Sequence, residues 1–77
     1  MRVGVIGTGH VGLVTCVSFA ALGHEVVGMD SDQSKIDSLT GGVAPFYEPG
    51  LQELLESELA SGRLHFTTRP EEVVDGA

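Results

Sequence analysis

The chain has 77 residues, of which 42% are hydrophobic, and it contains a single cysteine, Cys16. A hydrophobic share of this size is typical of a globular protein, and one thiol excludes an internal disulfide and fits the reducing cytosol. Four basic against eleven acidic residues give a net charge of −7, which repels a phosphate backbone and argues against nucleic-acid binding. The apolar stretches are too short for a membrane span or a signal segment, so we expect a cytoplasmic protein without membrane attachment.

Hydrophobic patterning and the positions of glycine and proline divide the chain into short elements. In chain order, the predicted elements are a strand over 2–6, a helix over 10–22, a strand over 25–29, a helix over 32–40, an irregular loop over 43–49, a helix from Pro49 to about Ser61, a strand over 64–67 and the opening of a helix over 70–76. Glycines stop the longer helices, at Gly23 and Gly62. Pro49 is expected as a first helical residue, and Asp32 as the N-cap of the second helix.

The alternation of strands and helices decides the fold class. Strand, helix, strand, two helices and strand in this order favour a parallel sheet with right-handed crossovers and flanking helices. Three strands make half of a doubly wound, Rossmann-type sheet. We therefore predict an α/β, Rossmann-type fold in which residues 1–77 are the N-terminal part of a nucleotide-binding domain in a larger protein.

A glycine-rich segment, Gly7-Thr8-Gly9-His10-Val11-Gly12, lies between the first predicted strand and the first predicted helix. It fits the G-x-G-x-x-G pattern of dinucleotide-binding turns. The first glycine permits a tight turn, the second lets a pyrophosphate approach the backbone, and the third lets the helix pack closely on the strand. The helix N-terminus then offers N–H donors and a partial positive charge to the phosphates. Alternatively, these glycines only shape the turn.

The residues between the glycines are less diagnostic. Thr8, His10 and Val11 line the turn, and we include them among the candidate cofactor contacts. His10 has two open interpretations, because its ring either meets the cofactor or is a solvated loop residue.

Two residues near the second strand complete the candidate cofactor site. Asp30, at the end of that strand, can accept hydrogen bonds from both ribose hydroxyls of an adenosine, and it disfavours a 2′-phosphate there. No arginine follows within residues 31–34 to neutralise such a phosphate, so the expected cofactor is NAD rather than NADP. Asp30 is alternatively a capping or turn residue, and Lys35 is either a cofactor contact or a solvated helix residue.

The cysteine and the remaining histidines are interpreted without a chemical role. Gly12, Cys16 and Ala20 are spaced by four and share one helix face, so Cys16 is expected to be a small buried hydrophobe where the helix approaches a sheet. His24 and His65 have no neighbouring cysteine or paired acid in the sequence. We therefore expect no metal site.

Three segments resemble those of the UDP-glucose/GDP-mannose dehydrogenases. They are Val-Gly-Val-Ile-Gly-Thr-Gly-His-Val-Gly-Leu-Val-Thr over residues 3–15, Ala-Pro-Phe-Tyr-Glu-Pro-Gly-Leu over residues 44–51, and Gly-Arg-Leu-His-Phe-Thr-Thr over residues 62–68. The resemblance covers the whole chain, and the aromatic form of the 44–51 loop indicates a member that acts on UDP-glucose. His10 departs from the family pattern, which has tyrosine at this place.

The resemblance implies a cytosolic, homodimeric enzyme that oxidises the C6 hydroxymethyl group of UDP-glucose to a carboxylate with two NAD molecules. The family's catalytic cysteine, lysine, asparagine and aspartate would lie beyond residue 77, with the central and UDP-sugar-binding domains, so no catalytic residue is expected in this chain. The family's cofactor contacts carry over to Gly7–Gly12, Asp30 and Lys35.

Other functions stay open at this point. One is a dehydrogenase of another nucleotide sugar, such as GDP-mannose or a UDP-N-acetylhexosamine. Another is a different NAD enzyme, such as a 3-hydroxy acid dehydrogenase, against which the 44–51 loop argues. A third is a non-catalytic nucleotide-sensing module that keeps the glycines and Asp30.

The 44–51 loop itself is expected to be ordered by its own packing. Two prolines stiffen its path, and Phe46 and Tyr47 are expected to cover apolar surface. A direct substrate contact is the alternative.

Overall fold

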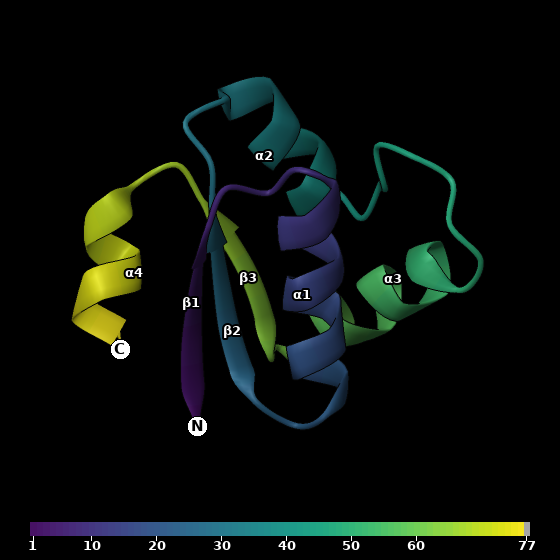
Figure 1. Ribbon diagram of the computed structural model, residues 1–77, viewed down its shortest axis with the longest axis horizontal. Helices are drawn as coiled ribbons and strands as arrows, with labels where there is room; N and C mark the ends of the chain where they lie inside the picture. The colour runs from purple at the N-terminus through teal and green to yellow at the C-terminus, as the bar shows by residue number, and fades with distance from the viewer. Residues whose placement is uncertain (77) are drawn as a thin grey trace.

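The computed structural model describes residues 1–76, along which strands and helices alternate (Figure 1). In chain order the elements are β1 (Arg2–Ile6), α1 (His10–Ala21), β2 (Glu25–Met29), α2 (Gln33–Thr40), α3 (Leu51–Ser61), β3 (Leu64–Thr67) and α4 (Pro70–Gly76). Every strand and helix predicted from the sequence is present, and the strands have the predicted bounds.

The three strands form one parallel sheet in the order β1-β2-β3. Its register places Val5, Gly28 and Phe66 side by side. This row faces α1, because a Cβ on Gly28 would come within 3.0 Å of the cysteine sulfur of α1. Neighbouring residues of a strand point to opposite faces, and Gly4 accordingly faces Val73 of α4. Helices therefore cover both faces of the sheet, which confirms the predicted α/β layering (Figure 1).

The hydrophobic core lies between α1, α3 and the sheet face that α1 covers. The enclosed side chains of α1 are Leu13, Cys16, Val17 and Ala20. They pack with Val26, Leu64 and Phe66 of the sheet and with Leu51 and Leu55 of α3. A fully buried valine or leucine contributes roughly 1.5–3 kcal/mol. This packing holds α1 against the sheet and so places its N-terminus at the end of β1.

Local hydrogen bonding explains where α1 ends. The N–H of Gly23 donates to the Ala20 carbonyl at 3.0 Å, and the N–H of His24 donates to the Phe19 carbonyl at 3.2 Å. These two bonds make a Schellman motif. The predicted stop at Gly23 is confirmed, with Leu22 as the last, capping residue.

The start of α3 corrects the prediction for Pro49. The helix begins at Leu51, not at Pro49. The N–H of Leu51 donates to the Glu48 carbonyl at 3.0 Å, and Gly50 has a φ of +83°. Proline at the second position and a left-handed glycine at the third are typical of a type II turn. Pro49 is therefore part of a turn that precedes the helix.

A partly buried ion pair lies at the end of α3, and no sequence pattern had indicated it. The side chain of Glu58 is 6% exposed, and its Oε1 lies 2.9 Å from Nη2 of Arg63. Nε of Arg63 also donates to the Ala20 carbonyl at 3.1 Å. That carbonyl is in the last turn of α1, where a positive charge is favourable. Arg63 thus links the ends of two helices immediately before β3.

Among the described residues, no helix is both long enough and apolar enough to cross a membrane.

Candidate functional site

The glycine-rich segment forms the turn from β1 into α1. Gly7 has a φ of +92°, which residues with a side chain rarely adopt, and its N–H donates to the Met29 carbonyl at 2.7 Å. A Cβ on Gly12 would lie 1.9 Å from the Gly7 carbonyl oxygen, so the approach of α1 to the turn requires glycine there. These two findings confirm the roles predicted for Gly7 and Gly12 in shaping the turn. Apart from Gly9 itself and its two chain neighbours, no described residue has an atom within 4 Å of a Cβ position there, so its backbone is open to an approaching group.

The N-terminus of α1 has no side-chain cap within residues 1–76, where Gly9 is the N-cap residue. The α2 helix differs, because its N-cap Asp32 accepts hydrogen bonds from the N–H groups of Ser34 and Lys35, as predicted for Asp32. The first N–H groups of a helix need acceptors. An anion at the start of α1 would supply them and would gain from the helix dipole. The pyrophosphate of a dinucleotide fits this arrangement.

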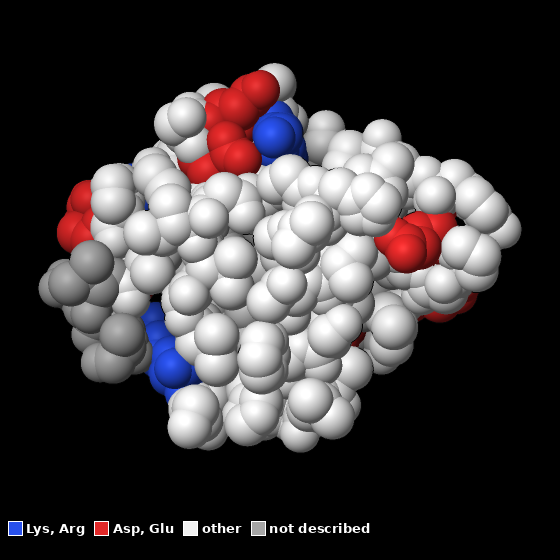
Figure 2. Space-filling view, viewed as in Figure 1, with Lys and Arg blue, Asp and Glu red and all other residues white. Residues whose placement is uncertain are grey.

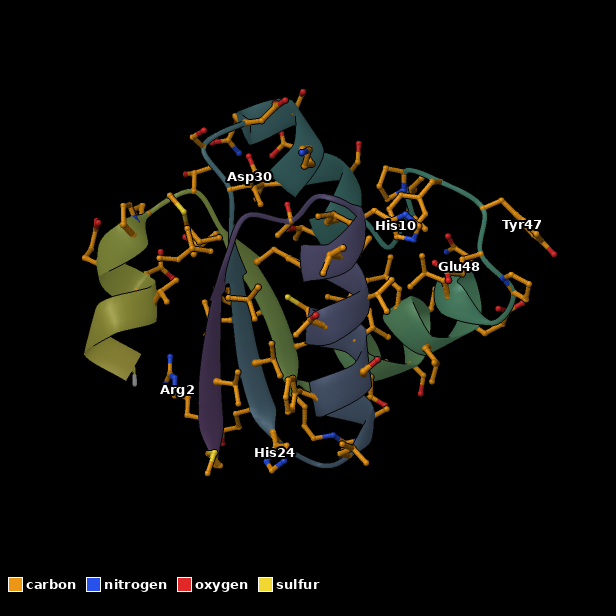
Figure 3. The ribbon with its side chains drawn as sticks, viewed as in Figure 1. Arg2, His10, His24, Asp30, Tyr47 and Glu48 are labelled. Atoms are coloured by element: carbon orange, nitrogen blue, oxygen red, sulfur yellow. The ribbon has the colours of Figure 1, made fainter. Side chains whose placement is uncertain are left out.

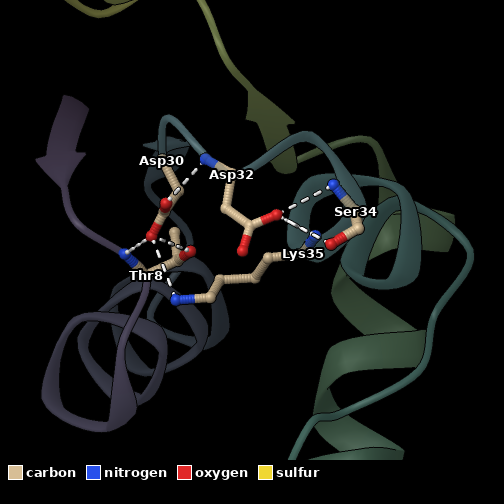
Figure 4. A network of polar contacts seen from close by, with 5 residues as sticks. All are labelled: Thr8, Asp30, Asp32, Ser34 and Lys35. Carbon is tan, nitrogen blue, oxygen red and sulfur yellow. Dashed lines mark hydrogen bonds and ion pairs between the residues drawn. The ribbon is translucent and has the colours of Figure 1, made fainter.

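Asp30 follows β2 and lies beside the glycine-rich turn (Figure 4). Its Oδ2 accepts hydrogen bonds from the N–H and the hydroxyl of Thr8, both at 3.1 Å, and from Nζ of Lys35 at 3.3 Å. Its Oδ1 accepts from the N–H of Asp32 at 3.0 Å. The backbone hydrogen bonds from Asp32 and Thr8 are the main causes that lower the pKa of Asp30 from 3.8 to about 2. The carboxylate is therefore ionised at neutral pH and suited to accept hydrogen bonds from ribose hydroxyls.

The structure brings Thr8, Asp30 and Lys35 together but gives them different exposures. Thr8 is 1% exposed, so its side chain points into the protein and its hydroxyl faces Asp30. The Lys35 side chain is 33% exposed and that of Asp30 is 15% exposed. Val11, the other predicted contact near this turn, is 80% exposed. Direct contact of these residues with a cofactor stays a prediction.

Charged groups are unevenly spread over the face shown in Figure 2. Acidic side chains gather at the top of the view, over the start of α2, with a basic side chain against them. Asp30, Asp32 and Lys35 belong to this part of the chain, and Lys35 pairs with Asp30. The surface over α1 is largely uncharged. A phosphate at the start of α1 therefore meets little repulsion from the rest of this helix, although the chain is acidic as a whole.

His10 begins α1 and contacts the loop between α2 and α3 (Figure 3). Its Nε2 lies 2.8 Å from Oε2 of Glu48, and its ring centroid lies 4.3 Å from that of Phe46. Neither interpretation of His10 made from the sequence included these contacts. Glu48 is 38 residues away along the chain, so no local pattern could indicate it. The pair fastens the loop to the N-terminus of α1.

The two aromatic residues of this loop have opposite placements. Phe46 is partly buried and packs against the hydrophobic core, as expected. Tyr47 is 90% exposed, and its side chain points away from the protein (Figure 3). The expectation that Tyr47 covers apolar surface is therefore wrong. With the Phe46 ring turned inward, the loop directs the next side chain outward.

Cys16 lies inside the core, as predicted. It is 0% exposed, and burial raises the pKa of its thiol to about 12. Because the thiolate is the reactive form, this cysteine is a poor nucleophile. His65 lies 3.4 Å from a carboxylate oxygen of Glu72. In the part of the chain that the structure describes, no three His, Cys, Asp or Glu side chains are grouped to hold a metal ion.

Together these features define a class of protein. A parallel sheet, a glycine-rich turn into an uncapped helix, and an ionised carboxylate after the second strand make a dinucleotide-binding, Rossmann-type domain.

Comparison with known proteins gives the family. The chain belongs to the UDP-glucose/GDP-mannose dehydrogenase family, because the NAD-binding domain of that family matches residues 1–77. It is 52% identical over 68 residues to a UDP-glucose 6-dehydrogenase of Bacillus subtilis, a match that covers 88% of this chain and 16% of that protein. This family membership decides against a 3-hydroxy acid dehydrogenase, and it makes NAD the cofactor of the domain.

Solved structures of the family share the fold. A GDP-mannose dehydrogenase from Pseudomonas aeruginosa has a TM-score of 0.95 and 40% identity, with 100% of this chain and 18% of that one covered. A UDP-D-ManNAc dehydrogenase from Pyrococcus horikoshii has a TM-score of 0.89 and 39% identity, with 94% and 17% covered. The chain therefore spans 16–18% of the length of these relatives.

Proposed function

We propose that this chain is the part of a UDP-glucose 6-dehydrogenase that binds the adenosine ribose and the pyrophosphate of NAD. The observation that carries the proposal is that the uncapped N-terminus of α1 and the ionised Asp30 lie next to one another, joined through Thr8. The N–H groups at the start of α1 hold the pyrophosphate, and Asp30 accepts hydrogen bonds from the ribose hydroxyls. NAD supplies the hydride acceptor when it is bound.

Asp30 also accounts for a preference for NAD over NADP. A 2′-phosphate removes one hydroxyl donor and brings a second negative charge close to the carboxylate. The repulsion between unit charges 4 Å apart is about 1 kcal/mol in water and about 4 kcal/mol at an effective dielectric constant of 20. With the lost hydrogen bond, this corresponds to a preference of at least about a hundredfold.

UDP-glucose is the substrate that the similarities favour. The relative with 52% identity is a UDP-glucose 6-dehydrogenase, and the 44–51 loop has the aromatic form of the segment. In this proposal the complete enzyme is a cytoplasmic homodimer that oxidises the C6 hydroxymethyl group to a carboxylate. Its substrate-binding and catalytic residues would lie outside this chain.

The test is a comparison of substrates with the complete protein. We expect the highest kcat/KM with UDP-glucose and NAD, two NADH formed per sugar, and at least about hundredfold lower kcat/KM with NADP. A higher kcat/KM with GDP-mannose or with UDP-N-acetylmannosamine would contradict the choice of substrate. Absence of NADH formation with all three, in a protein that binds NAD, would favour a sensing module.

A second candidate is a GDP-mannose dehydrogenase. The specific observation in its favour is the TM-score of 0.95 over the whole chain with the Pseudomonas aeruginosa enzyme. The same substrate comparison separates the two candidates.

A further inference from the structure

Thr8 is the least exposed polar residue of the glycine-rich turn. Only 1% of it is exposed, yet both of its hydrogen-bond donors point at a residue 22 positions away. Its N–H and its hydroxyl each lie 3.1 Å from the same oxygen, Oδ2 of Asp30 (Figure 4). A buried hydroxyl committed to a carboxylate in this way is not free to bind a ligand at the surface.

We propose that Thr8 is a positioning residue that orients the Asp30 carboxylate for the ribose of NAD. The proposal rests on the proposed function of Asp30 as the ribose anchor. A carboxylate has about four lone-pair positions, two on each oxygen. Oδ2 already accepts from both donors of Thr8 and from Lys35, whereas Oδ1 accepts only from the N–H of Asp32. Oδ1 is therefore the oxygen on which acceptor capacity for ribose hydroxyls remains, and Thr8 fixes which oxygen that is.

The other donors to Asp30 are less suited to this task. Lys35 approaches at the longest distance, 3.3 Å, and its flexible side chain is 33% exposed. The Asp32 N–H belongs to the same short segment as Asp30 and moves with it. Of the three residues that donate to Asp30, only Thr8 comes from the turn that leads into α1. It therefore sets the position of the ribose-binding carboxylate relative to the N–H groups that bind the pyrophosphate.

The experiment compares Thr8→Val and Thr8→Ser in the complete enzyme. Valine keeps the branched shape and removes the hydroxyl, and serine keeps the hydroxyl. We expect Thr8→Val to raise KM for NAD roughly tenfold and to leave kcat nearly unchanged. Thr8→Ser should restore KM to within about twofold of the wild type. If Thr8→Val does not fold, Thr8→Ala removes the same hydroxyl. Equal KM values for the hydroxyl-free variant and the wild type would overturn the proposal.

The Asp30→Ala background separates this proposal from the one on which it rests. If Thr8 acts through Asp30, Thr8→Val should change KM for NAD by less than about twofold once Asp30 is alanine. The same tenfold loss in that background would mean that Thr8 acts on the turn itself, and would overturn the positioning role while leaving Asp30 as the anchor. If Asp30→Ala leaves KM for NAD unchanged, Asp30 is not the ribose anchor, and the positioning role of Thr8 is refuted as well.

Discussion

The substitution Gly12→Ala tests how closely α1 must lie on the glycine-rich turn. The added Cβ would be 1.9 Å from the Gly7 carbonyl oxygen and 3.0 Å from its carbon, whereas ordinary contact begins at about 3.4 Å. Both neighbours are backbone atoms, so no side chain can rotate away. The start of α1 would have to move by about 1.5 Å, and overpacking of this kind costs about 1–3 kcal/mol. A lower Tm is the first expected result.

The same displacement should weaken NAD binding, because it carries the N–H donors of α1 away from the pyrophosphate. We expect KM for NAD to rise at least about tenfold in the complete enzyme, since misplacement by about 1 Å can cost a hundredfold. The matched control is Gly9→Ala. Gly9 has a φ of −69°, and no described residue beyond its chain neighbours has an atom within 4 Å of a Cβ position there, so the fold should tolerate the methyl group. That methyl should still obstruct the pyrophosphate.

The two variants should differ in their effects on Tm and on KM for NAD. Gly12→Ala should lower Tm and raise KM, whereas Gly9→Ala should raise KM with Tm nearly unchanged. Calorimetry and initial-rate kinetics on the complete enzyme measure both quantities. If Gly12→Ala leaves Tm unchanged, the packing argument is refuted. If Gly9→Ala binds NAD as tightly as the wild type, the phosphates do not lie against this turn.

Other substitutions address the remaining roles. Asp30→Ala should reduce the NAD-to-NADP ratio of kcat/KM at least about tenfold; an unchanged ratio would leave Asp30 a turn residue. The pKa of Asp30 is lowered from 3.8 to about 2. The stability gained from the ionised carboxylate is therefore complete above pH 3.8 and is lost as the pH falls through 2. The Tm values of the wild type and of Asp30→Asn should accordingly converge only in acid. Cys16→Ala should lower Tm and keep kcat within a few-fold, and a loss of several orders of magnitude would identify it as the nucleophile. Arg63→Met leaves the buried Glu58 side chain without its cation and should lower the stability of the protein by about 2 kcal/mol. The Tm of this variant should be lower than that of the double variant Arg63→Met with Glu58→Gln. Equal Tm values would show that the two side chains are not coupled.

The elements were predictable from the sequence because their causes are local. α1 ends where Gly23 donates to a carbonyl three positions earlier and His24 donates to one five positions earlier. Asp32 caps α2 by accepting from N–H groups two and three positions later. The order of these elements was enough to indicate a parallel sheet. Pro49 was misplaced because proline suits both a first helical position and the second position of a turn. The deciding residue was Gly50, whose φ is positive.

Contacts between distant segments could not be read from the sequence. Asp30 and the glycine-rich turn were correctly singled out, but the bond from Thr8 depends on how β1 and β2 pair. The contact of His10 with Glu48 spans 38 residues and depends on the path of the intervening loop. The sequence of that loop also did not indicate which of the adjacent residues Phe46 and Tyr47 faces inward. Sequence patterns thus identified the candidate site but not the network that holds it.

The close approach of Gly4 to Val73 has a consequence for synthesis on the ribosome. A Cβ on Gly4 would come within 2.3 Å of Val73, so α4 is seated directly on β1. The two residues are roughly 70 positions apart, and at about 5–20 residues per second their translation is separated by roughly 4–14 s. During that interval the face of β1 that α4 later covers has no helix on it. The nascent chain therefore passes through a stage in which β1 and β2 have both been made but the sheet has a helical layer only on the side of α1.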